Sequence, residues 1–232
     1  MEVSLKNRQM RITGEHVRIG FIYLLLLAGA LWHILGVFQH TMEVLAAPII
    51  IGVGAWLFLE YIFQLDHTEK VSFSFWSGSV LFLSLLIEWI GVKTGWLFGH
   101  YNYGEVLKPQ IAGVPLAIGF AWLGMLIASV AFVQRVMELH TKRRIVLASL
   151  LTGLLMVSFD VFLEPAAVKL EYWFWIDGFV PFSNYVTWFV ASTIFAYAGL
   201  RYKVFLNEIP AIAMHAYAAQ LLYFIITNMG IS

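Results

Sequence analysis

The sequence contains no cysteine and few charged residues. Without cysteine the chain has no disulfide, no thiolate zinc site and no cysteine-ligated iron–sulfur cluster. Asp, Glu, Lys and Arg make up 12% of the 232 residues, against roughly 25% in soluble domains. The 14 basic and 14 acidic residues balance, and no basic run resembles a nucleic-acid-binding patch. We therefore expect no nucleic-acid partner.

Apolar residues, by contrast, form 61% of the chain, and the mean hydropathy is +0.81. They gather into stretches of roughly twenty residues, which as helices are long enough to cross the hydrocarbon core of a bilayer. Backbone in contact with lipid must satisfy its own hydrogen bonds, which favours helices. The sequence thus predicts an all-α, polytopic membrane protein, with residues 1–232 as a single transmembrane domain. The seven predicted transmembrane helices span residues 19–38, 44–65, 74–92, 113–134, 145–165, 184–204 and 209–229.

The basic residues are unevenly distributed between the two sides of these spans. Eleven precede the first span or lie between spans two and three, four and five, or six and seven, and only Lys93, Lys108 and Lys169 lie on the other side. Because Lys and Arg are enriched in cytoplasmic loops, this bias predicts a cytoplasmic N-terminus and an outer C-terminus. We expect a multi-pass protein of a prokaryotic inner (cytoplasmic) membrane, with membrane lipid around it.

The two longest connections, 93–112 and 166–183, both lie on the predicted outer side and are rich in aromatic residues. Such residues often form a belt at the membrane interface, which is the simplest explanation. Three glycines in the first connection indicate tight turns, however, and favour a loop folded as a lid against the bundle. The ten aromatic residues among these 38 positions are Trp96, Phe98, Tyr101, Tyr103, Tyr172, Trp173, Phe174, Trp175, Phe179 and Phe182.

Three acidic residues lie near the outer ends of predicted spans: Glu88 in the third, and Asp160 and Glu164 in the fifth. A carboxylate at membrane depth costs at least about 2.5 to 3.5 kcal/mol, so these residues are functional candidates. Pairing with lysines of the outer loops, or contact with the interface, is the structural alternative. Asp160 and Glu164 are four residues apart and share one helical face. Pro165 disfavours helical geometry at Glu164 and is expected to end or bend the helix there.

Other polar residues in the spans carry a weaker signal. Glu60 lies late in the second span, where an anchor at the membrane boundary is a sufficient explanation. His33 and His215 lie in different spans and form no ligand pair with metal-binding spacing, so no metal site is predicted.

Two blocks of sequence resemble the signature of the CruF-like carotenoid biosynthesis membrane proteins, of the carotenoid 1,2-hydratase and bisanhydrobacterioruberin hydratase type. The first is residues 88–103, Glu-Trp-Ile-Gly-Val-Lys-Thr-Gly-Trp-Leu-Phe-Gly-His-Tyr-Asn-Tyr, followed by Gly113-Val114-Pro115 and Trp122. The second comprises Asp160, Pro165, Trp173, Trp175, Pro181, Asn184 and Trp188. Together the blocks cover roughly residues 60–190.

This resemblance implies hydration of an isoprenoid end group of an acyclic or monocyclic carotenoid, without a cofactor. An acid protonates the terminal alkene, a tertiary carbocation forms, and water adds to it. Removal from water favours the neutral form of a carboxyl group. Asp160 lies deepest of the three acids in the predicted spans, which makes it the preferred general acid, and Glu88 and Glu164 are further catalytic candidates. Aromatic faces shield the cation. The candidate substrate-binding residues are Trp96, Phe98, Tyr101, Tyr103, Trp122, Trp173, Trp175, Asn184 and Trp188.

Three other functions are alternatives for a chain with seven apolar stretches and acids within them. A retinal protein needs a Schiff-base lysine in a late span, and residues 209–229 contain none. A transporter also uses intramembrane carboxylates, but the acids here gather toward one membrane face and no inverted repeat is visible. An end-group cyclase or isomerase shares the carbocation with a hydratase and differs only in what captures it. The sequence leaves this last alternative open, along with the oligomeric state.

Overall fold

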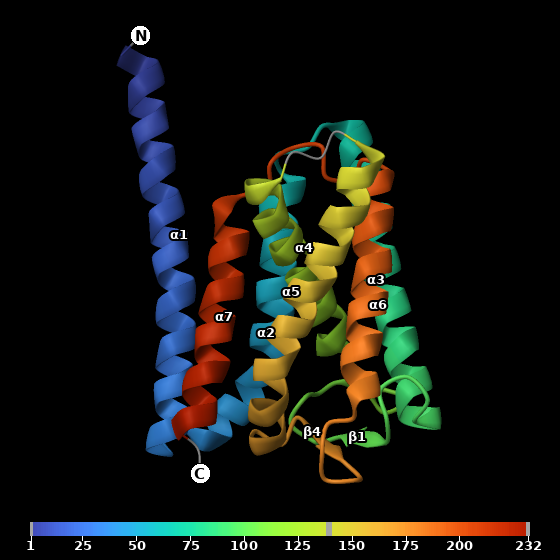
Figure 1. Ribbon diagram of the computed structural model, residues 1–232. Coiled ribbons are helices and arrows are strands. Elements are labelled where there is room, and N and C mark those ends of the chain that lie inside the picture. The colour runs from blue at the N-terminus through green and yellow to red at the C-terminus, as the bar shows by residue number, and fades with distance from the viewer. Residues whose placement is uncertain (1, 138–140, 231–232) are drawn as a thin grey trace.

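The computed structural model describes residues 2–137 and 141–230, which form seven long helices and four short strands (Figure 1). Each predicted apolar stretch overlaps one of these helices. The helices are α1 (Glu2–Leu35), α2 (Gln39–Ile62), α3 (His67–Thr94), α4 (Leu116–Val136), α5 (Lys142–Lys169), α6 (Phe182–Arg201) and α7 (Ala211–Gly230). The strands are β1 (Tyr101–Tyr103), β2 (Gln110–Ile111), β3 (Val114–Pro115) and β4 (Trp173–Trp175).

Five of the described helices are long and apolar enough to cross a membrane. The chain is therefore an all-α protein with several candidate membrane spans. α6 packs along α5, and α7 packs against α1, α4 and α5, so we propose that these two helices cross the bilayer with the others. The five candidate spans are Gly14–Leu35, Gln39–Ile62, His67–Thr94, Leu116–Val136 and Arg143–Lys169.

The two chain ends lie at opposite ends of the bundle (Figure 1). We propose seven crossings, with the N-terminus in the cytoplasm and the C-terminus outside, as the charge bias of the loops predicts. We expect a reporter fused to the N-terminus to be active only in the cytoplasm, and one fused to the C-terminus only outside. Activity of both fusions in the same compartment would rule out an odd number of crossings.

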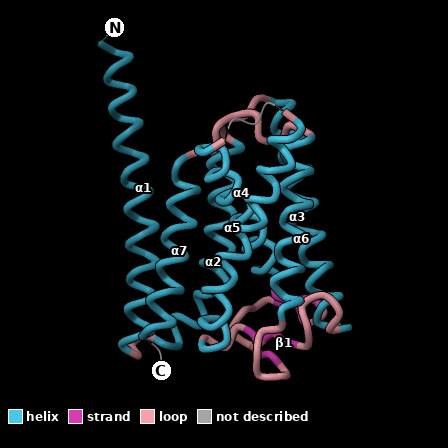
Figure 2. Tube along the Cα trace, in the orientation of Figure 1, coloured by secondary structure: helices cyan, strands magenta, loops and turns pink. Residues whose placement is uncertain are grey.

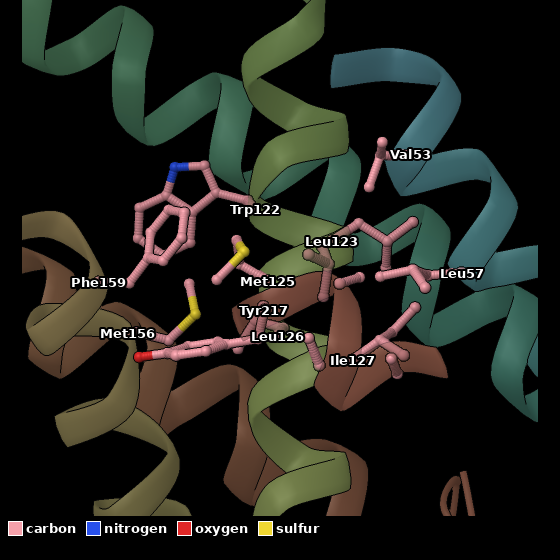
Figure 3. Close-up of a cluster of buried hydrophobic side chains, with 14 of the residues drawn as sticks. Val53, Leu57, Trp122, Leu123, Met125, Leu126, Ile127, Met156, Phe159 and Tyr217 are labelled. Carbon is pink, nitrogen blue, oxygen red and sulfur yellow. The ribbon is translucent and has the colours of Figure 1, made fainter. Parts of the chain in front are cut away.

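α4 occupies the centre of the bundle, and most of its side chains are buried. Figure 3 shows Leu123 and Ile127 of this helix facing Leu57 of α2, with Met156 and Phe159 of α5 on the other side. The close approach of α2 and α4 depends on two glycines. A Cβ atom at Gly54 would lie 2.4 Å from the backbone oxygen of residue 120, and one at Gly124 would lie 3.1 Å from the Cα atom of Gly54. Small residues allow such backbone contact between helices in membranes.

α3 begins well before the predicted span because a capping box starts it outside the apolar stretch. The Asp66 side chain accepts a hydrogen bond from the backbone N–H of Glu69 at 2.8 Å, and the Glu69 side chain accepts one from the N–H of Asp66 at 2.9 Å. The acidic pair thereby satisfies two N–H groups at the start of the helix.

Pro165 does not end α5, although an end there is one of the two outcomes expected from the sequence. The helix continues to Lys169 with the proline inside it. Transmembrane helices tolerate proline where neighbouring groups satisfy the freed backbone atoms. Pro165 lacks the N–H that would bond the backbone oxygen of residue 161; at the next residue, Asn228 of α7 donates a hydrogen bond to the backbone oxygen of Phe162 at 2.7 Å. Asp160 and Glu164 therefore remain on one continuous helix.

The two aromatic loops join at one end of the bundle in a small sheet, which the all-α prediction did not include (Figure 2). β1 from the first loop pairs antiparallel with β4 from the second. Tyr101 lies opposite Trp175, and Tyr103 lies opposite Trp173. A second pair, β2 with β3, forms a turn that leads into α4. The predicted lid is thus a pair of loops held together by backbone hydrogen bonds.

Candidate active site

The β1–β4 ladder turns four aromatic side chains toward the end of the bundle. Successive residues of a strand point to opposite faces, so the first and third residues of each strand share a face. Asn102 and Phe174, the middle residues, are exposed. The inward-facing residues are Tyr101 and Tyr103 of β1 and Trp173 and Trp175 of β4, and all four donate hydrogen bonds to buried carboxylates.

The β1 tyrosines bind Glu88 of α3, which is 4% exposed. Its Oε2 accepts hydrogen bonds from the hydroxyls of Tyr101 at 2.6 Å and Tyr103 at 2.8 Å. Its Oε1 accepts one from the indole N–H of Trp122 in α4 at 3.0 Å. Three neutral hydrogen-bond donors thus surround this buried carboxyl group.

The hydroxyls of Tyr101 and Tyr103 act only as donors toward Glu88. Burial, followed by the negative charge of Glu88, raises the pKa of each hydroxyl above the ordinary value for tyrosine. Both therefore stay protonated across the physiological pH range.

The β4 tryptophans bind Glu164 of α5 in the same manner. Its Oε2 accepts hydrogen bonds from the indole N–H groups of Trp173 at 2.9 Å and Trp175 at 2.8 Å. Its Oε1 accepts a third from the side-chain amide of Asn184 in α6 at 3.2 Å. Glu164 is 2% exposed, so this carboxyl group also depends on three neutral donors rather than on water.

Asp160 lies one helical turn before Glu164 and is completely buried. The same amide nitrogen of Asn184 donates to its Oδ2 at 2.7 Å. Its Oδ1 has no hydrogen-bond partner within the described part of the chain. One amide nitrogen thus contacts two carboxyl groups, and Asp160 has fewer donors around it than either glutamate.

A small cavity of about 50 Å³ lies between Glu88 and Glu164. It offers room for water, since a site needs about 10 to 15 Å³ of such space per molecule. The stacked rings of Trp122 and Trp188, with centroids 4.1 Å apart, form part of its wall. Asp160 does not line the cavity but lies behind Asn184, which does. The cavity walls thus combine two carboxylates with aromatic faces.

The loops that close this site are in direct backbone contact at Gly104. Its N–H donates to the backbone oxygen of Tyr172 at 2.9 Å, and a Cβ atom there would lie 2.1 Å from the backbone oxygen of Glu171. Only glycine allows the two loops to approach this closely.

Eleven of the twelve residues predicted for the site gather at this end of the bundle. Trp96 does not, because its side chain is 84% exposed and does not line the cavity. Three apolar residues complete the cavity wall without having been predicted: Ile118 and Ala121 of α4 and Leu163 of α5. Nothing distinguishes them from other apolar residues of the spans in the sequence.

The remaining polar candidates lie elsewhere. Glu60 forms an ion pair with Arg18 at 2.9 Å and accepts a hydrogen bond from Trp56, in keeping with an anchor at the other end of the bundle. His215 contacts the hydroxyl of Tyr23 at 3.3 Å. In residues 2–137 and 141–230, no three His, Asp or Glu side chains are grouped so that they would hold a metal ion.

Comparison with known proteins agrees with the sequence resemblance. The carotenoid biosynthesis protein family model matches residues 46–232. Bisanhydrobacterioruberin hydratase of Haloarcula japonica is 29% identical over 131 residues, which cover 51% of this chain and 44% of the relative. The alignment therefore spans less than half of the relative's length. No solved structure matches the chain. Since the family model covers most of the sequence, the chain belongs to the carotenoid biosynthesis protein family.

Proposed function

We propose that this protein is a carotenoid hydratase, which adds water to the terminal isoprenoid double bond of an acyclic or monocyclic carotenoid end group. The observation that carries the proposal is the contact of one amide, Asn184, with both Asp160 and Glu164 beside a cavity walled by aromatic rings. The family match and the name of the relative support a carotenoid as the substrate.

The acid in this proposal is the Asp160–Glu164 pair. Two buried carboxyl groups around one amide repel each other strongly if both are charged, so the pair holds one proton. Asp160 is its more favourable site at rest, because it has one hydrogen-bond donor against three for Glu164. Glu164 lines the cavity and delivers the proton to the substrate.

Addition of water then proceeds in two steps. The pair transfers its proton to one carbon of the terminal double bond, the π electrons form the new C–H bond, and a tertiary carbocation remains on the neighbouring carbon. A water molecule in the cavity, oriented by the carboxylate of Glu88, attacks that carbon through oxygen. Loss of a proton from this oxygen to a carboxylate of the site yields the tertiary alcohol and restores the original proton count. No electron leaves or enters the system, so the reaction needs no redox cofactor.

The aromatic wall has a defined part in this reaction. A carbocation close to a base loses a proton readily, which would return an alkene. The faces of Trp122 and Trp188 offer electrostatic stabilisation of about 0.5 to 2 kcal/mol per ring without offering a base. Their stacking at 4.1 Å covers one face of each ring, so the outer faces and the ring edges are the parts left for contact with the cation.

A cyclase or isomerase of the same end group would use the same acid and the same wall, so the products must distinguish them. We expect cells that accumulate acyclic and monocyclic carotenoids to form, on expression of this protein, pigments heavier by one water, as measured by mass spectrometry. A variant carrying both Asp160→Asn and Glu164→Gln is the control. Products isomeric with their precursors would contradict hydration, and unchanged pigments would favour a binding or transport role.

A further inference from the structure

A long apolar groove of about 560 Å³ lies on the side of the bundle between α3 and α6. Both helices pack on α4, but within the described residues they contact each other little. Trp76 and Phe195 form the floor and are 6% and 7% exposed. Phe75 and Ile194 at the rim are 79% and 60% exposed, so the groove opens toward the surrounding lipid.

Three of the polar side chains that line the groove donate hydrogen bonds to the protein backbone, and the fourth, Tyr202, is 76% exposed. The indole N–H of Trp76 donates to the backbone oxygen of Phe195 at 3.0 Å. The hydroxyl of Ser79 donates to the backbone oxygen of Phe75 at 2.8 Å. What remains is an elongated surface of rings and aliphatic side chains, which suits a ligand without polar groups along its length.

Both walls of the groove lead to the candidate active site. On α3, Trp76, Val80, Ser84 and Glu88 follow one another at intervals of four residues and are all buried, which places each beside the next in a row that winds slowly around the helix. The distance from Trp76 to Glu88 along the helix axis is about 18 Å. A row of buried α3 residues thus connects the groove floor with a carboxylate of the site.

On α6, a corresponding buried face carries Asn184, Trp188 and Phe195. Phe195 of the groove floor also lies against Trp122, with ring centroids 6.2 Å apart. Trp122 in turn stacks on Trp188 and donates to Glu88. A continuous series of aromatic rings therefore connects the groove with the cavity where we place the reaction.

We propose that the polyene chain of the substrate lies in the α3–α6 groove, with its reacting end directed past Trp122 and Trp188 toward the acids. This inference rests on the proposed function for the identity of the occupant. Because the groove opens to the bilayer, the carotenoid enters sideways from lipid rather than through the loops. The β1–β4 ladder then closes only the end of the site where water and protons are handled.

The proposal is tested by filling the groove with a bulky side chain at one serine and placing the same side chain at a second serine outside the groove. Ser79 lines the groove on α3, whereas Ser158 lies on α5 outside it. Ser79 is partly exposed and Ser158 is exposed, and both donate to the backbone oxygen four residues earlier. Ser79→Trp and Ser158→Trp proteins are purified from a host that accumulates an acyclic carotenoid, and the bound pigment per protein is measured by absorbance. We expect at least about a tenfold loss of bound pigment for Ser79→Trp, because the new ring removes apolar contact surface, and little change for Ser158→Trp.

A second readout separates this inference from the proposed function. Hydration is measured with a full-length carotenoid and with a short isoprenoid that carries the same end group. We expect Ser79→Trp to slow hydration of the long substrate and to leave that of the short one nearly unchanged. Loss of pigment without any hydration by the unmodified protein would support the groove and overturn the hydratase.

The opposite result overturns the groove and leaves the hydratase standing. If Ser79→Trp binds pigment and hydrates the long substrate as Ser158→Trp does, the groove holds lipid instead. A changed oligomeric state with unchanged pigment would assign the groove to a second copy of the chain. Ala198→Leu, on the α6 wall, repeats the comparison with a smaller change, in case the tryptophan variant does not fold.

Discussion

Replacing Asp160 with asparagine is expected to lower the hydration rate at least about a hundredfold, the lower end for loss of a positioned proton donor. Asparagine keeps the shape of the side chain but carries no acidic proton. It also removes the charge repulsion that holds a proton on the pair. Glu164 keeps its three hydrogen-bond donors, but the pair has lost the carboxyl group that we propose holds its proton at rest. The rate is measured on purified protein, with thermal stability compared in parallel.

Two further variants make this result interpretable. Glu164→Gln removes the member of the pair that lines the cavity, and a comparable loss of hydration is expected. Glu105→Gln changes an exposed acid of the first aromatic loop, which pairs with Lys108 at 2.7 Å, and should leave the rate unchanged. Near-normal hydration by Asp160→Asn would show that Asp160 is a structural partner and would move the acid to Glu88 or Glu164.

Replacing Gly104 with alanine is expected to separate the two aromatic loops. The added Cβ atom meets the backbone oxygen of Glu171 at 2.1 Å, and backbone cannot yield as a flexible side chain can. Overpacking of this kind typically costs about 1 to 3 kcal/mol, which corresponds to about a fivefold to 150-fold loss of the docked loops. Glu88 and Glu164 would lose aligned donors, and hydration should fall accordingly.

Hydrogen exchange measures this effect independently of activity. Amides of β1 and β4 should exchange faster in Gly104→Ala, while those of α4 stay protected. Asn102→Ala is the matched control, because Asn102 belongs to the same strand but points outward. Unchanged exchange and activity in Gly104→Ala would mean that the loops tolerate separation at this point, contrary to the assigned role of the ladder.

The sequence predicts the helices and the site unevenly, for physical reasons. Apolar stretches of membrane length mark each helix, because the bilayer demands about twenty apolar residues from any span. The buried acids stand out for the same reason. The family resemblance is confirmed by the match over residues 46–232. These signals depend on local composition, which a single sequence displays directly.

The partners of each acid depend on long-range contacts, which local composition does not encode. The pairing of Tyr103 with Trp173 joins loops about seventy positions apart, and neither strand is long enough to be recognised alone. Trp96 is an aromatic residue of the same loop as Tyr101 and Tyr103, yet its side chain is exposed. α5 continues through Pro165, beside a hydrogen bond from Asn228 of α7, and such contacts between helices are not visible in local composition.

We propose that this chain alone adds water to a carotenoid end group. The most direct measurement is incubation of the purified protein, in detergent or lipid, with an acyclic carotenoid in water enriched in oxygen-18. Hydration predicts a product with one labelled oxygen, formed without nucleotide, flavin or added metal and absent with Asp160→Asn. A product that lacks the label, or one isomeric with the substrate, would contradict the account.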